Sequence, residues 1–189
     1  MEIVFFVLIG AAVVILIYGV MIYNNLVRLK HDVTKAWANI DVLLKQRHDE
    51  LPKLVETCKQ YMKFEQETLE KVMNARAAVN RAMQQGDVGA VGAAEGQLRL
   101  GLGNLFAVAE NYPDLKANET FLHLQSRISG LENSIADRRE FYNESVNNNV
   151  RIEQFPDVIL ARQFSFKAAE LLEFDESEKT DVDMGTLFS

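Results

Sequence analysis

The N-terminal segment constrains the fold most, because it is apolar over a length that can cross a bilayer. It runs from Ile3 to Ile22, reads IVFFVLIGAAVVILIYGVMI and contains no charged residue. As a helix this segment would cover roughly 30 Å, the thickness of the hydrocarbon core. A cleaved signal peptide would need a basic start and a shorter apolar core, and this segment has neither. We therefore predict a transmembrane anchor over residues 1–22, with Tyr18 and Tyr23 at the membrane interface.

The charges beside this anchor predict its orientation. Only Glu2 precedes the apolar segment, whereas Arg28, Lys30 and Lys35 follow it closely. Lys and Arg next to a span are retained on the cytoplasmic side of the membrane. We predict a single pass through the bacterial inner membrane, with membrane lipid as a partner and the body of the protein in the cytoplasm.

The overall charge argues against nucleic acid as a partner. The chain has 189 residues and a formal net charge of −7, and acidic residues are concentrated at its C-terminal end. Binding to nucleic acid depends on neutralising phosphates with Lys and Arg, which this balance does not favour. The acidic end predicts a solvated or disordered tail over residues 173–189. The one cysteine, Cys58, cannot form an intrachain disulfide and is expected to be buried.

After the span, apolar residues recur at steps of three, four or seven, which is typical of an amphipathic helix. The series is Leu26, Leu29, Val33, Trp37, Ile40, Leu44, Leu51, Val55, Cys58, Met62, Leu69, Val72 and Val79. It predicts one helix from the span to about Gln85, where Gly86 can adopt the left-handed cap conformation. The soluble part would extend roughly 95 Å if straight. We therefore expect it to be kinked, to project as a rod or to pack against other copies.

Three later segments also have helical spacing. We predict a second helix over Val88–Asn111 and a third that begins after Asn118, its N-cap, and ends near Gln154. A shorter amphipathic segment covers Asp157 to Leu172. There is no strand signal, so the expected fold is all-α: an N-terminal transmembrane helix continuing into an elongated antiparallel helical bundle over residues 23–172, with three long helices and a short fourth.

Pro52 interrupts the first helical pattern and follows a polar stretch that contains Arg47 and His48. Proline has no N–H, so the His48 carbonyl loses its helical donor and the turn opens. The freed carbonyl needs water or a side chain, and Arg47 or a donor from a neighbouring helix could serve. We interpret the polar stretch as the solvated collar of a kink. The alternative is a notch for a partner chain, formed by Arg47, His48, Pro52 and Glu56.

The sequence contains no recognisable catalytic or metal-binding constellation. The run His48, Asp49 and Glu50 would place its side chains about 100° apart on a helix, where they do not converge. Glu119 and His123 share a helical face but lack the further carboxylates of a di-iron bundle. No Gly-rich phosphate loop or nucleophile elbow is present. We expect neither an enzyme nor a cofactor.

Four segments resemble signature sequences of the LemA family. They are AWANIDVLLKQRHDELPKLVE (36–56), YPDLKAN (112–118), FYNESV (141–146) and FPDVILARQFSF (155–166). The resemblance spans the chain in order, and it implies one N-terminal membrane helix, an elongated α-helical soluble domain and no established enzymatic activity. Ser165 stands where a glycine is common in the family, and the chain after Leu172 departs from the usual pattern.

Two functional hypotheses follow. The first is a membrane-anchored protein that self-assembles as a homo-oligomer and scaffolds or shapes the inner membrane. We expect Leu26, Leu29 and Val33 to be left uncovered by their own chain and to contact a second copy. Gly92 and Gly96, a small-xxx-small pair, would permit a close approach of backbones, with a loose first helical turn as the alternative. The second hypothesis is an adaptor that delivers or regulates a membrane protease or an envelope-stress system, based on the acidic tail and the polar notch.

Overall fold

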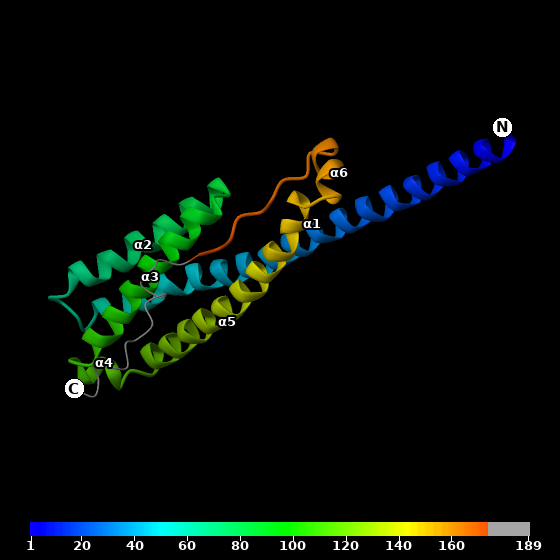
Figure 1. The fold of residues 1–189 in the computed structure, drawn as a ribbon. Coiled ribbons are helices and arrows are strands. Elements are labelled where there is room, and N and C mark those ends of the chain that lie inside the picture. The colour runs from blue at the N-terminus through cyan, green and yellow to red at the C-terminus, as the bar shows by residue number, and fades with distance from the viewer. Residues whose placement is uncertain (174–189) are drawn as a thin grey trace, which may run out of the picture. The chain divides into compact units, whose positions relative to one another are not determined.

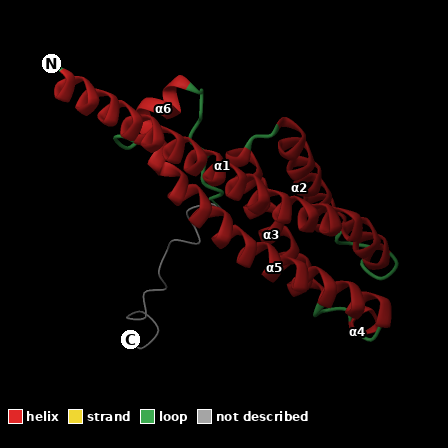
Figure 2. Ribbon diagram, turned by 90° about the vertical axis from the view of Figure 1, so that its right-hand side faces the viewer, coloured by secondary structure: helices red, strands yellow, loops and turns green. Residues whose placement is uncertain are grey.

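The computed structural model describes residues 1–173, and it is helical with no strand among them (Figure 1, Figure 2). The predicted all-α class, with a long apolar N-terminal helix followed by packed helices, is confirmed. Apart from Glu173, the predicted acidic tail lies outside the described residues. The elements are α1 (Glu2–Lys59), α2 (Gln66–Gln85), α3 (Val88–Ala109), α4 (Pro113–Lys116), α5 (Glu119–Asn149), the 3-10 helix η1 (Val150–Glu153) and α6 (Asp157–Gln163).

The chain forms two compact units, and α1 and α5 each contribute to both. The first unit, called here the juxtamembrane unit, comprises Met1–Ile40 and Arg138–Glu170. The second, called here the distal unit, comprises Asp41–Asp137 and the chain from Leu171 onward.

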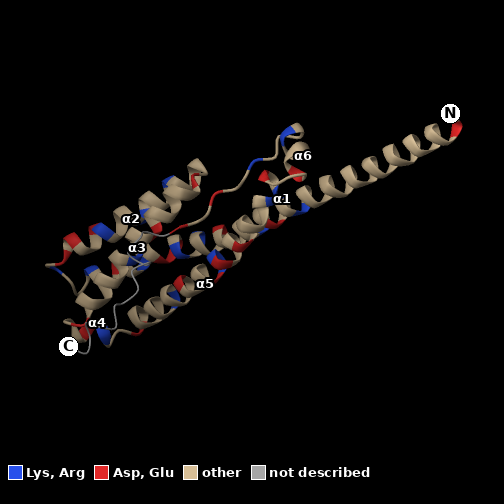
Figure 3. Ribbon diagram, in the orientation of Figure 1, with Lys and Arg blue, Asp and Glu red and all other residues tan. Residues whose placement is uncertain are grey.

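The first half of α1 contains the apolar segment. Among the described residues, α1 is the one helix long and apolar enough to cross a membrane, and none of its most apolar stretch is buried by the rest of the chain. Figure 3 shows no charge along its first turns after Glu2. The side chains of this segment are therefore free to contact lipid.

The predicted continuous helix from the span to Gln85 is wrong. α1 ends at Lys59, and α2 begins only at Gln66, so the chain turns in between. Met62 lies in this turn and is nevertheless buried in the same core as Cys58 and Leu69. The apolar spacing thus passes through the turn because both helices and the turn itself contribute to one core. The helix that follows the apolar segment is therefore shorter than the roughly 95 Å expected, because it ends at Lys59.

The distal unit is a helical bundle around one apolar core. α2 and α3 lie side by side in it (Figure 1). Gly86 ends α2 with φ 68°, the left-handed cap that the sequence predicts. The Asp87 carboxylate accepts a hydrogen bond from the Ala90 N–H at 2.8 Å, which caps α3. The predicted cap at Asn118 is confirmed, because its Oδ1 accepts from the Phe121 N–H at 2.9 Å.

In the juxtamembrane unit, α6 packs against the end of the apolar segment of α1. Ile22 and Leu26 of α1 form a small buried cluster with Ile152 of η1 and Ala161 of α6. Tyr23 stacks edge-on against Phe164, with ring centroids 4.8 Å apart. α6 thus lies at the level of the final turn of the apolar segment.

The predicted helical segment from Asp157 to Leu172 is shorter than expected, because α6 ends at Gln163. Ser165 adopts a left-handed backbone conformation with φ 55°, which stops the helix. The chain then runs back along α5. There the Tyr142 hydroxyl donates to the Glu170 carbonyl at 2.8 Å, and the Ala169 N–H donates to Asn149 Oδ1 at 3.3 Å.

Candidate functional site

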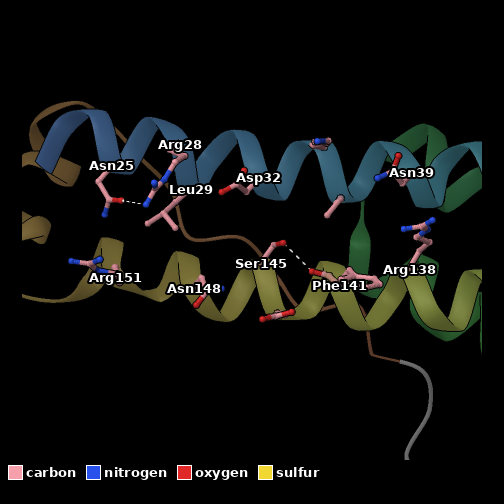
Figure 4. Close-up of a pocket in the computed structure, with 13 residues that line it drawn as sticks. Asn25, Arg28, Leu29, Asp32, Asn39, Arg138, Phe141, Ser145, Asn148 and Arg151 are labelled. Carbon is pink, nitrogen blue, oxygen red and sulfur yellow. Dashed lines mark hydrogen bonds between the residues drawn. The ribbon is translucent and has the colours of Figure 1, made fainter. Parts of the chain in front are cut away.

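A polar groove lies between α1 and the last turns of α5 in the juxtamembrane unit (Figure 4). Its volume is about 660 Å³. Figure 4 shows Arg28, Leu29 and Asp32 on the α1 side and Ser145 and Asn148 on the α5 side. The remaining lining residues are Asn25, Lys35, Ala36, Asn39, Arg138, Phe141, Glu144 and Arg151.

The groove carries an excess of positive charge. Two acidic side chains line it, Asp32 and Glu144, against four basic ones, which are Arg28, Lys35, Arg138 and Arg151. Several guanidinium groups around one cavity favour an anion with planar or tetrahedral oxygens, such as a carboxylate or a phosphate. The groove is thus suited to binding an anionic group.

A second cavity of about 530 Å³ continues from this groove toward the span. Asn25, Arg28 and Arg151 line both cavities. The Arg28 guanidinium donates to Asn25 Oδ1 at 3.0 Å, and Arg151 lies 3.5 Å from the buried Asp157 carboxylate. The other end of the second cavity is lined by Tyr18, Met21, Ile22 and Asn24, which belong to the end of the span or follow it directly. One continuous depression therefore joins a cationic surface to an apolar one.

The distal unit contains a buried ion pair between Arg47 of α1 and Glu95 of α3. Each side chain is 3% exposed, and the two are hydrogen bonded. A second carboxylate, Glu132 of α5, lies 3.8 Å from Arg47. Burial raises the pKa of both carboxyl groups, and the nearby guanidinium of Arg47 only partly offsets this. Three helices, α1, α3 and α5, contribute these charges. The cluster is therefore part of the bundle interior and is not accessible to a ligand from solvent.

The carbonyl left free by Pro52 has a partner from α2. Arg76 Nε donates to the His48 carbonyl oxygen at 2.9 Å, and Arg76 Nη2 lies 2.7 Å from the Nε2 atom of the His48 ring. Of the two donors considered from the sequence, the neighbouring helix supplies it and Arg47 does not. Burial and the Arg76 charge together lower the pKa of His48, and Asp49 opposes them weakly. α1 is helical through Pro52, which does not end it.

The interpretation of this stretch as a solvated collar is wrong for its main members. Arg47 and Glu50 are buried, and Glu50 pairs with Arg127 of α5 at 3.0 Å. Of the residues assigned to a partner notch, Arg47 and His48 are engaged by other helices of the same unit, and Pro52 is half-buried. Only Glu56 is exposed. The sequence does not reveal this burial, because the partners of Arg47 and Glu50, on α3 and α5, are distant along the chain.

The predicted self-association residues are mostly covered by their own chain. Leu26 and Leu29 are buried, and Leu26 packs on η1 and α6, so the expectation that this face stays uncovered is wrong. Gly92 does serve a close backbone approach, but a Cβ there would lie 2.0 Å from the Glu173 carbonyl oxygen of the same chain. Val33 and Gly96 are half-buried.

Sequence reasoning missed the exposed apolar residues around α6. Ile159 and Phe164 belong to the segment with amphipathic spacing, yet they are 60% and 54% exposed, and Phe155 just before α6 is 82% exposed. This segment contains more large apolar side chains than one short helix can bury, and that number is the signal that could have revealed their exposure. Arg138 and Arg151 were also missed, because nothing in their local sequence places them opposite Arg28.

No catalytic arrangement is found within residues 1–173. No group of His, Cys, Asp and Glu side chains in that range could hold a metal ion. The Cys58 thiol is buried, and burial raises its pKa to about 12, so it is a poor nucleophile.

Comparison with known proteins gives a family. The LemA family profile matches residues 36–185. The chain is 26% identical over 192 residues to magnetosome protein MamQ 2 of Paramagnetospirillum magneticum, covering 89% of this chain and 71% of that protein. It is 26% identical over 174 residues to magnetosome protein MamQ of Magnetospirillum gryphiswaldense, covering 79% and 64%. Protein LemA of Metamycoplasma hominis is 28% identical over 167 residues, covering 87% and 74%.

The profile match takes in both helical units and most of the chain that follows the span. The signature segments also lie at the places that build these units: one on α1 around Pro52, one at α4, one on α5 and one around α6. On this match, the protein belongs to the LemA family.

Proposed function

We propose that this chain is a membrane-anchored structural protein that self-assembles and scaffolds or shapes the inner membrane. The observation that carries the proposal is the continuity of α1. This helix runs for 58 residues from the apolar segment into the packed body without a linker. Within the juxtamembrane unit, such a continuous helix transmits the position of the packed helices to the bilayer, which a flexible tether would not do.

Two further observations support a structural role. The described residues contain no catalytic or metal-binding group, and the cationic groove adjoins the end of the span. The similarity to magnetosome proteins is consistent with a role in organising a cellular structure. Since Leu26 and Leu29 are buried, we assign self-association to the part of the span before Ile22, whose apolar side chains are exposed.

The second proposal is an adaptor for a membrane protease or stress system. The notch that motivated it is largely filled by Glu95 and Arg76 of the same unit. The acidic tail lies outside the described residues, apart from Glu173.

Particle mass and vesicle shape together test the structural proposal. The full chain would be purified in mild detergent and its mass measured, then reconstituted into vesicles of phosphatidylcholine and phosphatidylglycerol and imaged by electron cryomicroscopy. We expect oligomers in detergent and vesicles of altered curvature. A monomer that leaves vesicles round would contradict the proposal, and a monomer that captures a membrane protease would favour the adaptor.

A further inference from the structure

The segment that contains η1 and α6, residues 150–164 and called here the η1–α6 hairpin, exposes large apolar side chains beside the end of the apolar segment of α1. Phe155, Ile159 and Phe164 are 82%, 60% and 54% exposed. Phe155 and Ile159 are four residues apart, while Leu160 and Ala161 pack inward on α1. The segment around α6 thus exposes three large apolar side chains, one on α6 itself and one on each side of it. Large apolar surface left exposed on a folded protein marks a contact with another phase or molecule.

The depth of this hairpin follows from α1. Ile22, the last residue of the apolar segment, is buried against Ala161 and Ile152, so α6 lies beside the final turn of the span. Ile3 is nineteen residues earlier on the same helix, which corresponds to roughly 29 Å along its axis, about one hydrocarbon thickness. When the span is in a bilayer, α6 is thus held at the boundary between acyl chains and headgroups.

The charges around the hairpin match such a boundary. Arg28 and Arg151 line both the groove and the cavity that reaches Tyr18 and Met21 of the span. Arg162 on α6 is exposed. Anionic headgroups attract such cations, and aromatic side chains are favoured at the same level.

We propose that the η1–α6 hairpin is a second membrane contact, which inserts Phe155 and Ile159 among the acyl chains while Arg28 and Arg151 bind anionic phospholipid headgroups. This inference rests on the proposed function, since it needs the span to be in a membrane. It adds an interfacial wedge in one leaflet to the transmembrane anchor. A wedge that occupies one leaflet only is a direct way to bend a bilayer.

Site-specific labelling of the full chain tests the wedge. Single substitutions Phe155→Cys and Ile159→Cys would carry an environment-sensitive fluorophore. Leu16→Cys, in the span, reports the anchor. Phe64→Cys is the matched control, because Phe64 is a 92% exposed phenylalanine in the distal unit. The native Cys58 is buried and stays unlabelled in the folded protein.

Labelled proteins would be reconstituted into phosphatidylcholine and phosphatidylglycerol vesicles that contain a lipid with a nitroxide high on its acyl chain. We expect blue-shifted emission and nitroxide quenching at positions 155, 159 and 16, and neither at 64. Quenching at 155 should fall when phosphatidylglycerol is omitted, and it should fall in the same way in the Arg28→Gln/Arg151→Gln variant.

The other outcomes overturn the proposal, each for a different reason. Quenching at position 16 but not at 155 or 159 would reject the wedge and leave the anchor intact. Protection of 155 from aqueous iodide without nitroxide quenching would mean that a protein surface covers the hairpin. Absence of quenching at 16 would reject both the wedge and the proposed function.

Discussion

His48 illustrates how one side chain is tuned by partners from another helix. Its ring accepts a contact from Arg76, and its carbonyl accepts the Arg76 Nε hydrogen bond. A protonated ring would face the Arg76 guanidinium, which adds to the burial that lowers the pKa of His48. Burial and the Arg76 charge therefore both favour the neutral form of the ring.

This lowered pKa predicts a pH effect on stability. As the pH is lowered through 6.5, the unfolded chain takes up a proton at His48 more readily than the folded chain does. The free energy of unfolding therefore decreases as the pH is lowered. We expect His48→Gln to lose less stability than the wild type between about pH 7.5 and about pH 5.5. Denaturant unfolding at several pH values measures it. Parallel pH profiles for the two proteins would contradict the assignment.

The backbone conformation at Ser165 is one that favours glycine. With φ 55° its backbone is in the left-handed region, which costs a residue with a Cβ roughly 1–2 kcal/mol. Glycine avoids this cost and loses some of the gain to its greater unfolded-state entropy. We expect Ser165→Gly to raise the free energy of unfolding by about 0.5–1 kcal/mol. The control Ser126→Gly, at an exposed site within α5, should lower it instead.

At the scale of elements, Pro52 and Arg76 are coupled across α1 and α2. In the wild type, Arg76 of α2 donates to the His48 carbonyl. Pro52→Ala would give this carbonyl a donor within α1 instead. We expect Pro52→Ala to keep α1 intact and to raise stability, and Arg76→Met to lower it in the wild type by about 1–2 kcal/mol. The loss should shrink by about 1 kcal/mol when Pro52→Ala is present. Additive effects in this double-mutant cycle would show that the carbonyl contact contributes nothing.

α3 offers a matched pair of glycines. At Gly92 a Cβ would lie 2.0 Å from the Glu173 carbonyl oxygen, whereas at Gly103 nothing lies within 4 Å. Gly103→Ala should therefore raise stability by about 1 kcal/mol through helix propensity. Gly92→Ala should lower the melting temperature, since the backbone at Glu173 must move away. Equal stabilisation by both substitutions would mean that this backbone contact is absent in solution.

Most elements were predictable from local signals, and most contacts were not. The end of α2 follows from Gly86 and the start of α5 from Asn118, because capping residues are adjacent to the helix ends that they cap. The turn after Lys59 has no glycine or proline, and its buried Met62 keeps the helical spacing, so it was missed. The burial of Arg47 and Leu26 depends on partners from α3 and α6, and spacing within one helix carries no information about them.

For the molecule as a whole, membrane orientation is the property that most needs a measurement. We predict a cytoplasmic body from Arg28, Lys30 and Lys35. Phe64→Cys provides a reporter, because Phe64 is 92% exposed and the Cys58 thiol, buried and with a pKa raised to about 12, does not compete. In intact cells the variant should resist membrane-impermeant thiol reagents and react once the membrane is permeabilised. Labelling of intact cells would reverse the topology.

The unbroken α1 also sets an angle. From the apolar segment to Ile40 the helix has no interruption, so each residue fixes the next by about 100° about the axis. One residue added between Ile22 and Leu26 would turn the span by that amount relative to α6 and shift it by roughly 1.5 Å. The rotational orientation of the span about its axis is therefore coupled to that of α6. Because no flexible linker lies between them, a rotation of the span within the bilayer also rotates α6.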